Sequence, residues 1–207
     1  MSPRLWPLVG VIPALVACRT GAWAGDIEAG RRIAEPCVAC HSEAGMSAME
    51  EIPSIAGQPD NFIQWQLVFY RTGRRKNEIM EAVASPLSDD DIRNLGAFFA
   101  SLPPSRPPQV KDAEAKDVGA KDTTASAEPG HTLGVQRHCD SCHGETFAGQ
   151  QAAPRLAGQR EAYLVKSLRD YQSNARPSSG GAAMTEVAGG LSDGDIQTLA
   201  RYLAKLP

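Results

Sequence analysis

The chain has 207 residues, of which 42% are hydrophobic and 22% charged, a composition typical of a globular protein rather than a disordered one. Its formal net charge of −3 argues against a nucleic-acid-binding protein, which would carry a basic excess. The length permits two small domains, but only 6% of the residues are aromatic, so such domains would need something besides side chains to fill their cores.

Residues 1–24 have the pattern of an export signal. Arg4 supplies positive charge, an apolar stretch covers residues 5–17, and Ala-Trp-Ala at residues 22–24 is typical of a cleavage site. The stretch is too short, and too interrupted by proline, to span a membrane stably. A second processing site stays open, because Leu-Val-Ala-Cys ending at Cys18 resembles a bacterial lipobox, which would tether a lipidated protein to a membrane. In both cases the sequence predicts an exported, periplasmic protein.

Two copies of a C-x-x-C-H motif follow, at residues 37–41 and 139–143. This spacing lets two thiols add to the two vinyl groups of one haem while the histidine of the same turn reaches the iron. Disulfides are usual in exported proteins, but a two-residue gap permits only a redox-type disulfide, and the strand and helix of a thioredoxin-like motif are not evident. The motifs therefore predict two covalently bound haem c groups. The attaching thiols and ligating histidines are Cys37, Cys40, His41, Cys139, Cys142 and His143.

The surroundings of the two motifs also repeat, which indicates an internal duplication. The segment IPSIAGQ at residues 52–58 matches APRLAGQ at residues 153–159, and LSDDDI at residues 87–92 matches LSDGDI at residues 191–196. Each copy then ends in a Leu-Pro pair. We therefore expect two like domains, each with its own haem.

The duplication divides the chain into domains at residues 25–102 and 131–207, joined by residues 103–130. The connecting segment contains five prolines, five alanines and no aromatic residue, and its charges come as alternating Lys-Asp pairs. This composition is typical of a solvated, flexible linker that proline extends in part.

Each domain is predicted to run, in chain order, through a helix, the haem turn, a loop, a middle helix, a short methionine-bearing segment and a final helix. The final helix has the clearest signals, because Ser88 and Asp91 form a capping box before an apolar stripe, and the second copy repeats both. The middle helix is expected at residues 61–71 and 161–172. The side chains expected to wall the haem pocket are Phe62, Trp65, Leu67, Phe69, Tyr163, Leu164, Leu168 and Tyr171. No alternating strand pattern occurs, so the predicted fold class is all-α, with two tandem domains that each wrap round one haem.

A haem iron in an electron carrier needs a second axial ligand, and a methionine thioether favours the reduced iron. Met80 lies 39 residues after His41, and Met184 lies 41 residues after His143. Each methionine also lies seven residues before its Leu-Ser-Asp repeat. We expect Met80 and Met184 to be the ligands; the alternative is that they only fill gaps in the core.

Other side chains compete for these positions. Met46 and Met49 follow the first motif too closely to reach the opposite face of the haem easily. His131 and His138 are possible replacements for Met184, but both precede the second motif, on what we expect to be the exposed side of its helix. None of the four is therefore expected to bind iron.

With P-x-[IL]-A-G-Q after each haem motif and L-S-D-x-D-I before each final helix, the two tandem domains resemble class I cytochrome c domains, and the chain as a whole resembles cytochrome c4. The diheme subunits of some periplasmic dehydrogenases, including flavocytochrome c sulfide dehydrogenase, are similar. The resemblance covers nearly all of residues 26–102 and 131–207, although the linker is longer than the family pattern. It implies that Pro53 and Pro154 each offer a backbone carbonyl to the ring N–H of the ligating histidine, which fixes the tautomer. It also implies that the two domains pack with their haem propionate edges close together.

Arg75 and Arg176 occupy equivalent places after the two middle helices. A guanidinium there is suited to pair with a haem propionate through two parallel hydrogen bonds; the alternative is an ordinary solvated arginine at the surface. The basic run at residues 71–76 likewise has two interpretations, an exposed face or a docking patch for a redox partner.

These observations predict an electron-transfer protein rather than an enzyme, one that meets its partners in weak, short-lived encounters. The resemblance implies a quinol-oxidising complex or a dehydrogenase as electron donor, and a terminal oxidase or reductase as acceptor. Two alternatives stay open. One is a subunit bound permanently to a periplasmic dehydrogenase, and the other is a haem enzyme such as a diheme peroxidase. The enzyme needs an iron with an open position, against which the methionine in each copy argues.

Overall fold

The computed structural model of the protein describes residues 25–104, 129–176 and 183–207. In these ranges the regular structure is helical, apart from an isolated bridge between Gln150 and Ala153, and this confirms the all-α prediction. The predicted export signal, Cys18 and most of the predicted linker lie outside the described residues. No helix in the described part of the chain has the length and apolar character to cross a membrane.

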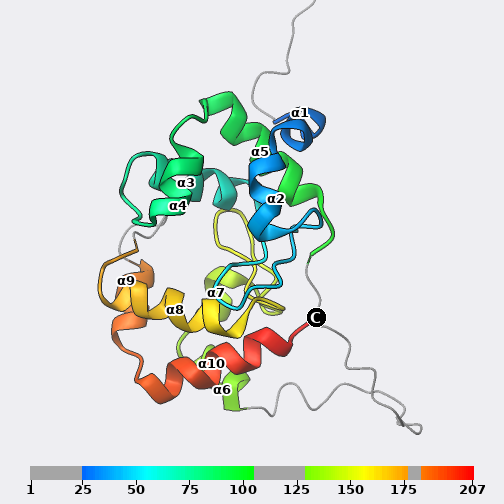
Figure 1. Ribbon diagram of the computed structural model, residues 1–207. Coiled ribbons are helices and arrows are strands. Elements are labelled where there is room, and N and C mark those ends of the chain that lie inside the picture. Colours follow the sequence, from blue (N-terminus) through cyan, green and yellow to red (C-terminus); the bar gives the residue numbers. More distant parts are fainter. Residues whose placement is uncertain (1–24, 105–128, 177–182) are drawn as a thin grey trace, which may run out of the picture.

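Among the described residues, five helices in each half follow one another in the same order, and Figure 1 shows the first half above the second. The first half contains α1 (Ile27–Ile33), α2 (Glu35–His41), α3 (Asp60–Arg71), α4 (Glu78–Ala84) and α5 (Asp89–Ser101). The second contains α6 (Pro129–Gln136), α7 (Cys139–His143), α8 (Glu161–Gln172), α9 (Ala183–Gly189) and α10 (Asp193–Lys205). The middle helices α3 and α8 lie where the apolar spacing predicts them, and the short methionine-bearing segments are themselves the helices α4 and α9.

The final helices begin with the capping boxes that the sequence predicts. The Ser88 hydroxyl accepts from the backbone N–H of Asp91 at 3.1 Å, and the Asp91 carboxylate accepts from the backbone N–H of Ser88 at 2.9 Å. Ser192 and Asp195 repeat both bonds at the start of α10. The Ser88 hydroxyl also donates to the Asp91 carboxylate at 2.7 Å. Because the hydrogen bonds from the hydroxyl and the backbone N–H of each serine stabilise the ionised carboxylate, they lower the pKa of Asp91 and Asp195.

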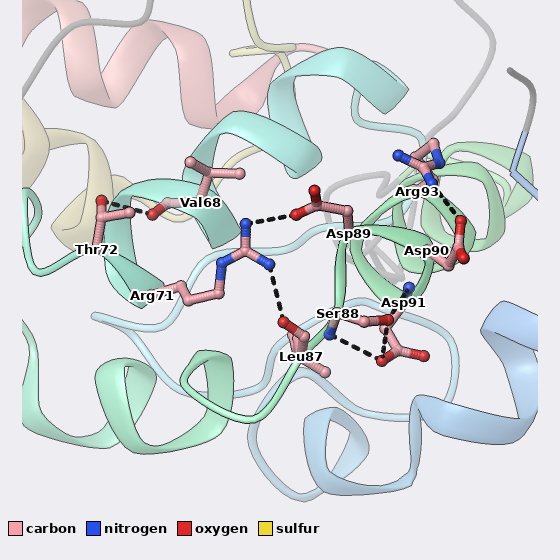
Figure 2. A network of polar contacts seen from close by, with 9 residues as sticks. All are labelled: Val68, Arg71, Thr72, Leu87, Ser88, Asp89, Asp90, Asp91 and Arg93. Carbon is pink, nitrogen blue, oxygen red and sulfur yellow. Dashed lines mark hydrogen bonds and ion pairs between the residues drawn. The ribbon is translucent and has the colours of Figure 1, made fainter.

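Arg71 joins the end of α3 to the start of α5, as Figure 2 shows. Its guanidinium donates to the backbone carbonyl of Leu87 at 2.9 Å and to the carboxylate of Asp89 at 2.6 Å. This hydrogen bond lowers the pKa of Asp89. Arg74, the next arginine of the basic run, lies over the ring of Phe69 at 5.0 Å. The other two cations of residues 71–76 are also engaged within their own domain, because Arg75 donates to Gln66 at 2.6 Å and Lys76 pairs with Glu81 at 3.8 Å.

The first helix of each domain crosses its last helix at a glycine. A Cβ atom on Gly30 of α1 would lie 2.1 Å from the backbone oxygen of Asn94 in α5. A Cβ on Gly130 of α6 would lie 2.2 Å from the Cβ of Tyr202 in α10. Only glycine, which has no side chain, permits this close approach. Each helix crossing therefore requires glycine at one position. The apolar core of each domain forms between its middle and last helices.

Candidate functional site

One continuous cavity of about 820 Å³ extends through both domains. This volume is near the upper end of the range for a pocket that holds a single small ligand, roughly 300–1,000 Å³. Its wall includes a histidine, a methionine and at least one motif cysteine from each domain. The residues of this kind in the wall are Cys37, Cys40, His41, Met80, Cys142, His143 and Met184. The fold thus gathers both predicted haem sites around a shared space.

His41 and His143 are buried, and each is held by one backbone carbonyl. The Nδ1 of His41 lies 2.8 Å from the carbonyl oxygen of Pro53, and the Nδ1 of His143 lies 2.8 Å from that of Pro154. Because a carbonyl can only accept, Nδ1 carries the hydrogen and the lone pair is on Nε2. Burial lowers the pKa of both histidines, although the carbonyl bond opposes this effect. Each ring is therefore kept in the neutral form that binds a metal.

In the described residues no disulfide joins the four motif cysteines. Burial raises the pKa of Cys37 to about 11 and also raises the pKa of Cys139. Three of the four thiol-bearing residues line the cavity, whereas Cys139 packs beside the apolar core of the second domain. Two cysteines beside a buried histidine in each domain suit the attachment of one haem through two thioether bonds.

Met80 and Met184 are half-buried on α4 and α9, and both face the cavity. Met46 and Met49 are exposed and do not line it. The two alternative histidines are also absent from its wall. His131 makes an edge contact with the ring of Tyr202 at 5.9 Å between centroids, and His138 is exposed just before α7.

The middle helices present most, but not all, of their predicted residues to the cavity. Phe62 and Leu67 of α3 line it, as do the four predicted residues of α8. Trp65 was expected beside them, and this prediction is wrong, because the side chain is 46% exposed and packs against Phe69 at 5.8 Å between ring centroids. Phe69 is buried but lies outside the cavity wall. The sequence prediction differs at these two residues because it assigns every large apolar residue of the helix to the face that lines the cavity.

Arg75 and Arg176 are not solvated surface residues, because only 8% and 3% of their surfaces are exposed. Arg75 donates to the side-chain oxygen of Gln66 at 2.6 Å and lies 4.7 Å from the ring centre of Tyr70. Arg176 donates to the hydroxyl of Ser167 at 2.8 Å. The two guanidiniums, one from each domain, thus line the same cavity.

The two arginines meet at Tyr163 of α8. Its hydroxyl accepts from Arg75 at 3.4 Å and from Arg176 at 3.2 Å, and Arg176 also donates to Gln66 of the other domain at 3.3 Å. Burial raises the pKa of Tyr163, but the two positive charges outweigh this effect and lower the pKa to about 7. The part of the cavity beside Tyr163 therefore has a positive electrostatic potential, which favours the binding of an anion.

The residues around these arginines fit the anionic edge of a haem. In the described ranges neither guanidinium makes an ion pair with an aspartate or glutamate, and Nε of Arg176 and Nε2 of Gln66 are buried without a hydrogen-bond partner. Buried cations without a counter-ion are costly, so a bound anion is expected to complete the site. Carboxylates such as haem propionates match the planar, two-pronged guanidinium.

Four residues at the domain interface were missed by sequence reasoning: Gln58, Gln66, Gln159 and Tyr163 as a polar group. Gln58 and Gln159 end the A-G-Q triplet that both copies share, so the repeat itself contained a signal for them. Gln66 and Tyr163 differ between the copies, and nothing in the sequence distinguished them from ordinary helix residues.

Comparisons with known protein sequences agree with this geometry. The family description "Cytochrome c" matches residues 27–120 and again 127–207. A protein named cytochrome c4, from Pseudomonas aeruginosa, is 32% identical over 190 residues, which cover 88% of this chain and 90% of that protein. One named thiosulfate dehydrogenase electron acceptor, from Stutzerimonas stutzeri, is 29% identical over an alignment of 208 positions that covers 97% of this chain and 94% of that protein.

The same arrangement occurs in a solved structure. The crystal structure of reduced recombinant cytochrome c4 from Pseudomonas stutzeri is similar to this chain with a TM-score of 0.71 and 28% sequence identity. The similarity covers 89% of this chain and 100% of that one. It therefore extends over both domains rather than over one repeat.

Proposed function

Because this chain belongs to the cytochrome c family and is a diheme electron-transfer protein of the cytochrome c4 kind, we propose that each domain holds its haem iron between a histidine and a methionine. The pairs are His41 with Met80 and His143 with Met184. Two covalently bound haem c groups, attached through the four motif thiols, supply the one-electron chemistry. The observation that carries the proposal is the single cavity whose wall contains both pairs.

The chain's own residues set the conditions for this chemistry. The carbonyls of Pro53 and Pro154 hold Nδ1–H of each histidine, so the ring orientation is fixed and Nε2 would be the nitrogen that binds iron. The apolar residues of α3 and α8 in the cavity wall would limit the contact of a bound haem with water. Arg75 and Arg176 provide buried positive charge for the haem propionates. Together these contacts keep the coordination unchanged between the two oxidation states.

The proposed role is that of a carrier and not an enzyme. With a thioether available in each domain, neither iron keeps an open position for a substrate, and this weighs against a diheme peroxidase. The predicted export signal places the protein in the periplasm, and lipidation of Cys18 would bring it to a membrane.

The partners that fit this role are a quinol-oxidising complex or a dehydrogenase as donor and a terminal oxidase or reductase as acceptor. A relative that covers 97% of this chain is named thiosulfate dehydrogenase electron acceptor, and this favours a dehydrogenase as one donor. The second candidate function is therefore a dedicated electron acceptor of a dehydrogenase, with the same haem chemistry. Copurification of an oxidising enzyme with the protein from its native host would identify that case.

The first experiment is a spectroscopic redox titration of the mature, haem-loaded protein, followed by addition of carbon monoxide to the reduced form. We expect two haems per chain, both at positive potential and both unreactive toward carbon monoxide, because every iron already has two axial ligands. One iron that binds carbon monoxide would contradict the proposed ligands in that domain and favour the enzyme. A single haem per chain would overturn the assignment of two like domains.

A further inference from the structure

The two glutamines that end the A-G-Q triplets reach across the domain interface. Gln159 accepts from the backbone N–H of Ser54 at 2.8 Å and donates to the backbone carbonyl of Ser54 at 2.8 Å. Gln58 accepts from the backbone N–H of Arg155 at 3.0 Å and donates to its carbonyl at 2.9 Å. Ser54 and Arg155 hold equivalent places in the repeat, so each domain grips the same backbone position of the other.

The backbone unit that Gln159 binds is the one that holds the histidine of the first domain. The carbonyl of Pro53 and the N–H of Ser54 belong to one planar amide. The carbonyl accepts from Nδ1 of His41 at 2.8 Å, while the N–H donates to Gln159 at 2.8 Å. A chain of two hydrogen bonds through one amide therefore connects a side chain of the second domain to the iron-ligating histidine of the first.

The mirror arrangement serves the second domain. The carbonyl of Pro154 accepts from Nδ1 of His143 at 2.8 Å, and the next backbone N–H, that of Arg155, donates to Gln58 at 3.0 Å. Both glutamines are only 4% exposed, so water does not compete for these bonds. Each histidine is thus connected to the domain that does not contain it.

Both glutamines are held in place by the last helix of their own domain. The glycine before each glutamine has a positive φ, 65° at Gly57 and 69° at Gly158, which an L side chain rarely adopts. The N–H of Gly57 donates to the carbonyl of Phe99 at 2.9 Å, and that of Gly158 donates to Leu203 at 2.9 Å. The amide groups are therefore pre-positioned and do not depend on a flexible loop.

We propose that Gln58 and Gln159 are positioning residues that act across the interface, each lowering the reduction potential of the haem in the other domain. An amide whose N–H donates a hydrogen bond becomes polarised, so its carbonyl accepts more strongly, by roughly 10–30% per bond. A stronger acceptor on Nδ1–H makes the imidazole a more basic ligand, which favours ferric iron. The inference rests on the proposed function, because it requires that His41 and His143 bind haem iron.

The test replaces each glutamine in the full haem-loaded chain by methionine, which has a similar length but no amide. Redox titration followed by NMR gives the potential of each haem, and the Nδ1–H resonance of each ligating histidine in the reduced protein reports its hydrogen bond. We expect Gln159→Met to raise the potential of the first haem and to move the His41 resonance upfield, with the second haem unchanged. Gln58→Met is expected to do the reverse.

The matched control is Arg160→Lys. The Nε of Arg160 donates to the backbone carbonyl of Ser47 across the same interface at 2.6 Å. Its side chain makes no hydrogen bond to either of the backbone amides whose carbonyls accept from His41 and His143. Lysine keeps the charge but removes the guanidinium, so we expect both potentials to stay unchanged. A shift in this control as large as that of the glutamine variants would show that looser docking explains the effect, and it would overturn the inference.

Other outcomes also decide the matter. If Gln159→Met leaves both potentials unchanged, shifts both equally, or shifts only the haem of its own domain, the glutamine is an interface contact and nothing more. If that variant does not accumulate with two haems, Gln159→Asn takes its place, because it keeps the amide but shortens the side chain by one methylene, and the same crossed shift is expected. Failure of the proposed function shows differently, as a wrong haem count or carbon monoxide binding in the unaltered protein.

Discussion

The two domains share one scaffold but differ on the faces that meet. At the last position of the middle helix, Arg71 in the first domain and Gln172 in the second both donate to the backbone carbonyl before the final helix, each at 2.9 Å. Different side chains there perform one structural task. This part of the repeat is constrained by its own domain, so substitution has preserved the contact.

The interface positions have diverged further. The third residue of the middle helix is Phe62 in one domain and Tyr163 in the other, and only the tyrosine offers a hydroxyl to both arginines. Arg176 has three side-chain acceptors, whereas Arg75 has two. Equivalent residues therefore have unequal surroundings, and we expect the two haems to have different reduction potentials. The duplication explains why both domains have the same fold. The differences described here lie at the interface between the two domains.

The largest effect is expected when one domain loses its methionine. Met80→Ala and Met184→Ala should each open one iron, so that one of the two reduced haems binds carbon monoxide while the other stays unreactive. Absorbance spectra with and without the gas measure the fraction that reacts. Met46→Ala is the control, since that exposed residue lies outside the cavity. Binding at both irons in a single variant would show that the domains are not independent.

The helix crossings provide the next test, on stability. Gly30→Ala places a methyl group against the backbone of α5, and Gly130→Ala places one against Tyr202. We expect each change to lower the free energy of unfolding of its own domain by about 1–3 kcal/mol. Denaturant titration monitored at the haem band measures this loss. Gly189→Ala, where no atom lies within 4 Å of the added Cβ, should be nearly neutral; an equal loss there would refute the role of the crossings.

The buried arginines sharpen the comparison of the two haems. Replacing either arginine by glutamine removes a positive charge that favours the reduced iron, so both Arg75→Gln and Arg176→Gln should lower a reduction potential. We expect shifts of some tens of millivolts, on the scale where ~59 mV is tenfold in a one-electron equilibrium. Arg176→Gln is expected to have the larger effect, because Arg176 is more deeply buried. Redox titration of both variants measures the order, and a larger shift for Arg75→Gln would reverse our view of the asymmetry.

The smallest effect concerns pH and the capping boxes. The pKa of Asp91 and Asp195 is lowered in the folded protein, so each contributes stability that is present above the ordinary carboxyl pKa, about 4, and is lost as the pH falls through the folded value. Because water screens both carboxylates, Asp91→Asn and Asp195→Asn should each cause only a small loss of stability at pH 7, the smallest of the effects predicted here. Unfolding measured from pH 7 down to pH 3 tests this. Unequal losses in the two domains would contradict the equivalence of their caps.

Much of the fold was predictable because its signals are local. The C-x-x-C-H turns, the capping boxes and the apolar stripe of each final helix involve residues a few positions apart, and the structure has helices at each of these places. The repeat added the domain count, since two copies of one pattern imply two copies of one structure. Trp65 shows the limit, because whether an aromatic residue on a helix faces the cavity or the solvent depends on what packs beside it.

The sequence alone was enough to identify the two haem motifs, the helical elements, and the glutamines and arginines that occur in both copies. Only the tertiary structure decided what the glutamines and arginines contact. Gln159 meets Ser54 across 105 residues of sequence, and Arg176 meets Gln66 across 110. Such contacts depend on how one domain docks on the other, and no pattern within either copy encodes that docking. Burial then turns two unremarkable arginines into a site for anions, because a charge removed from water needs a partner.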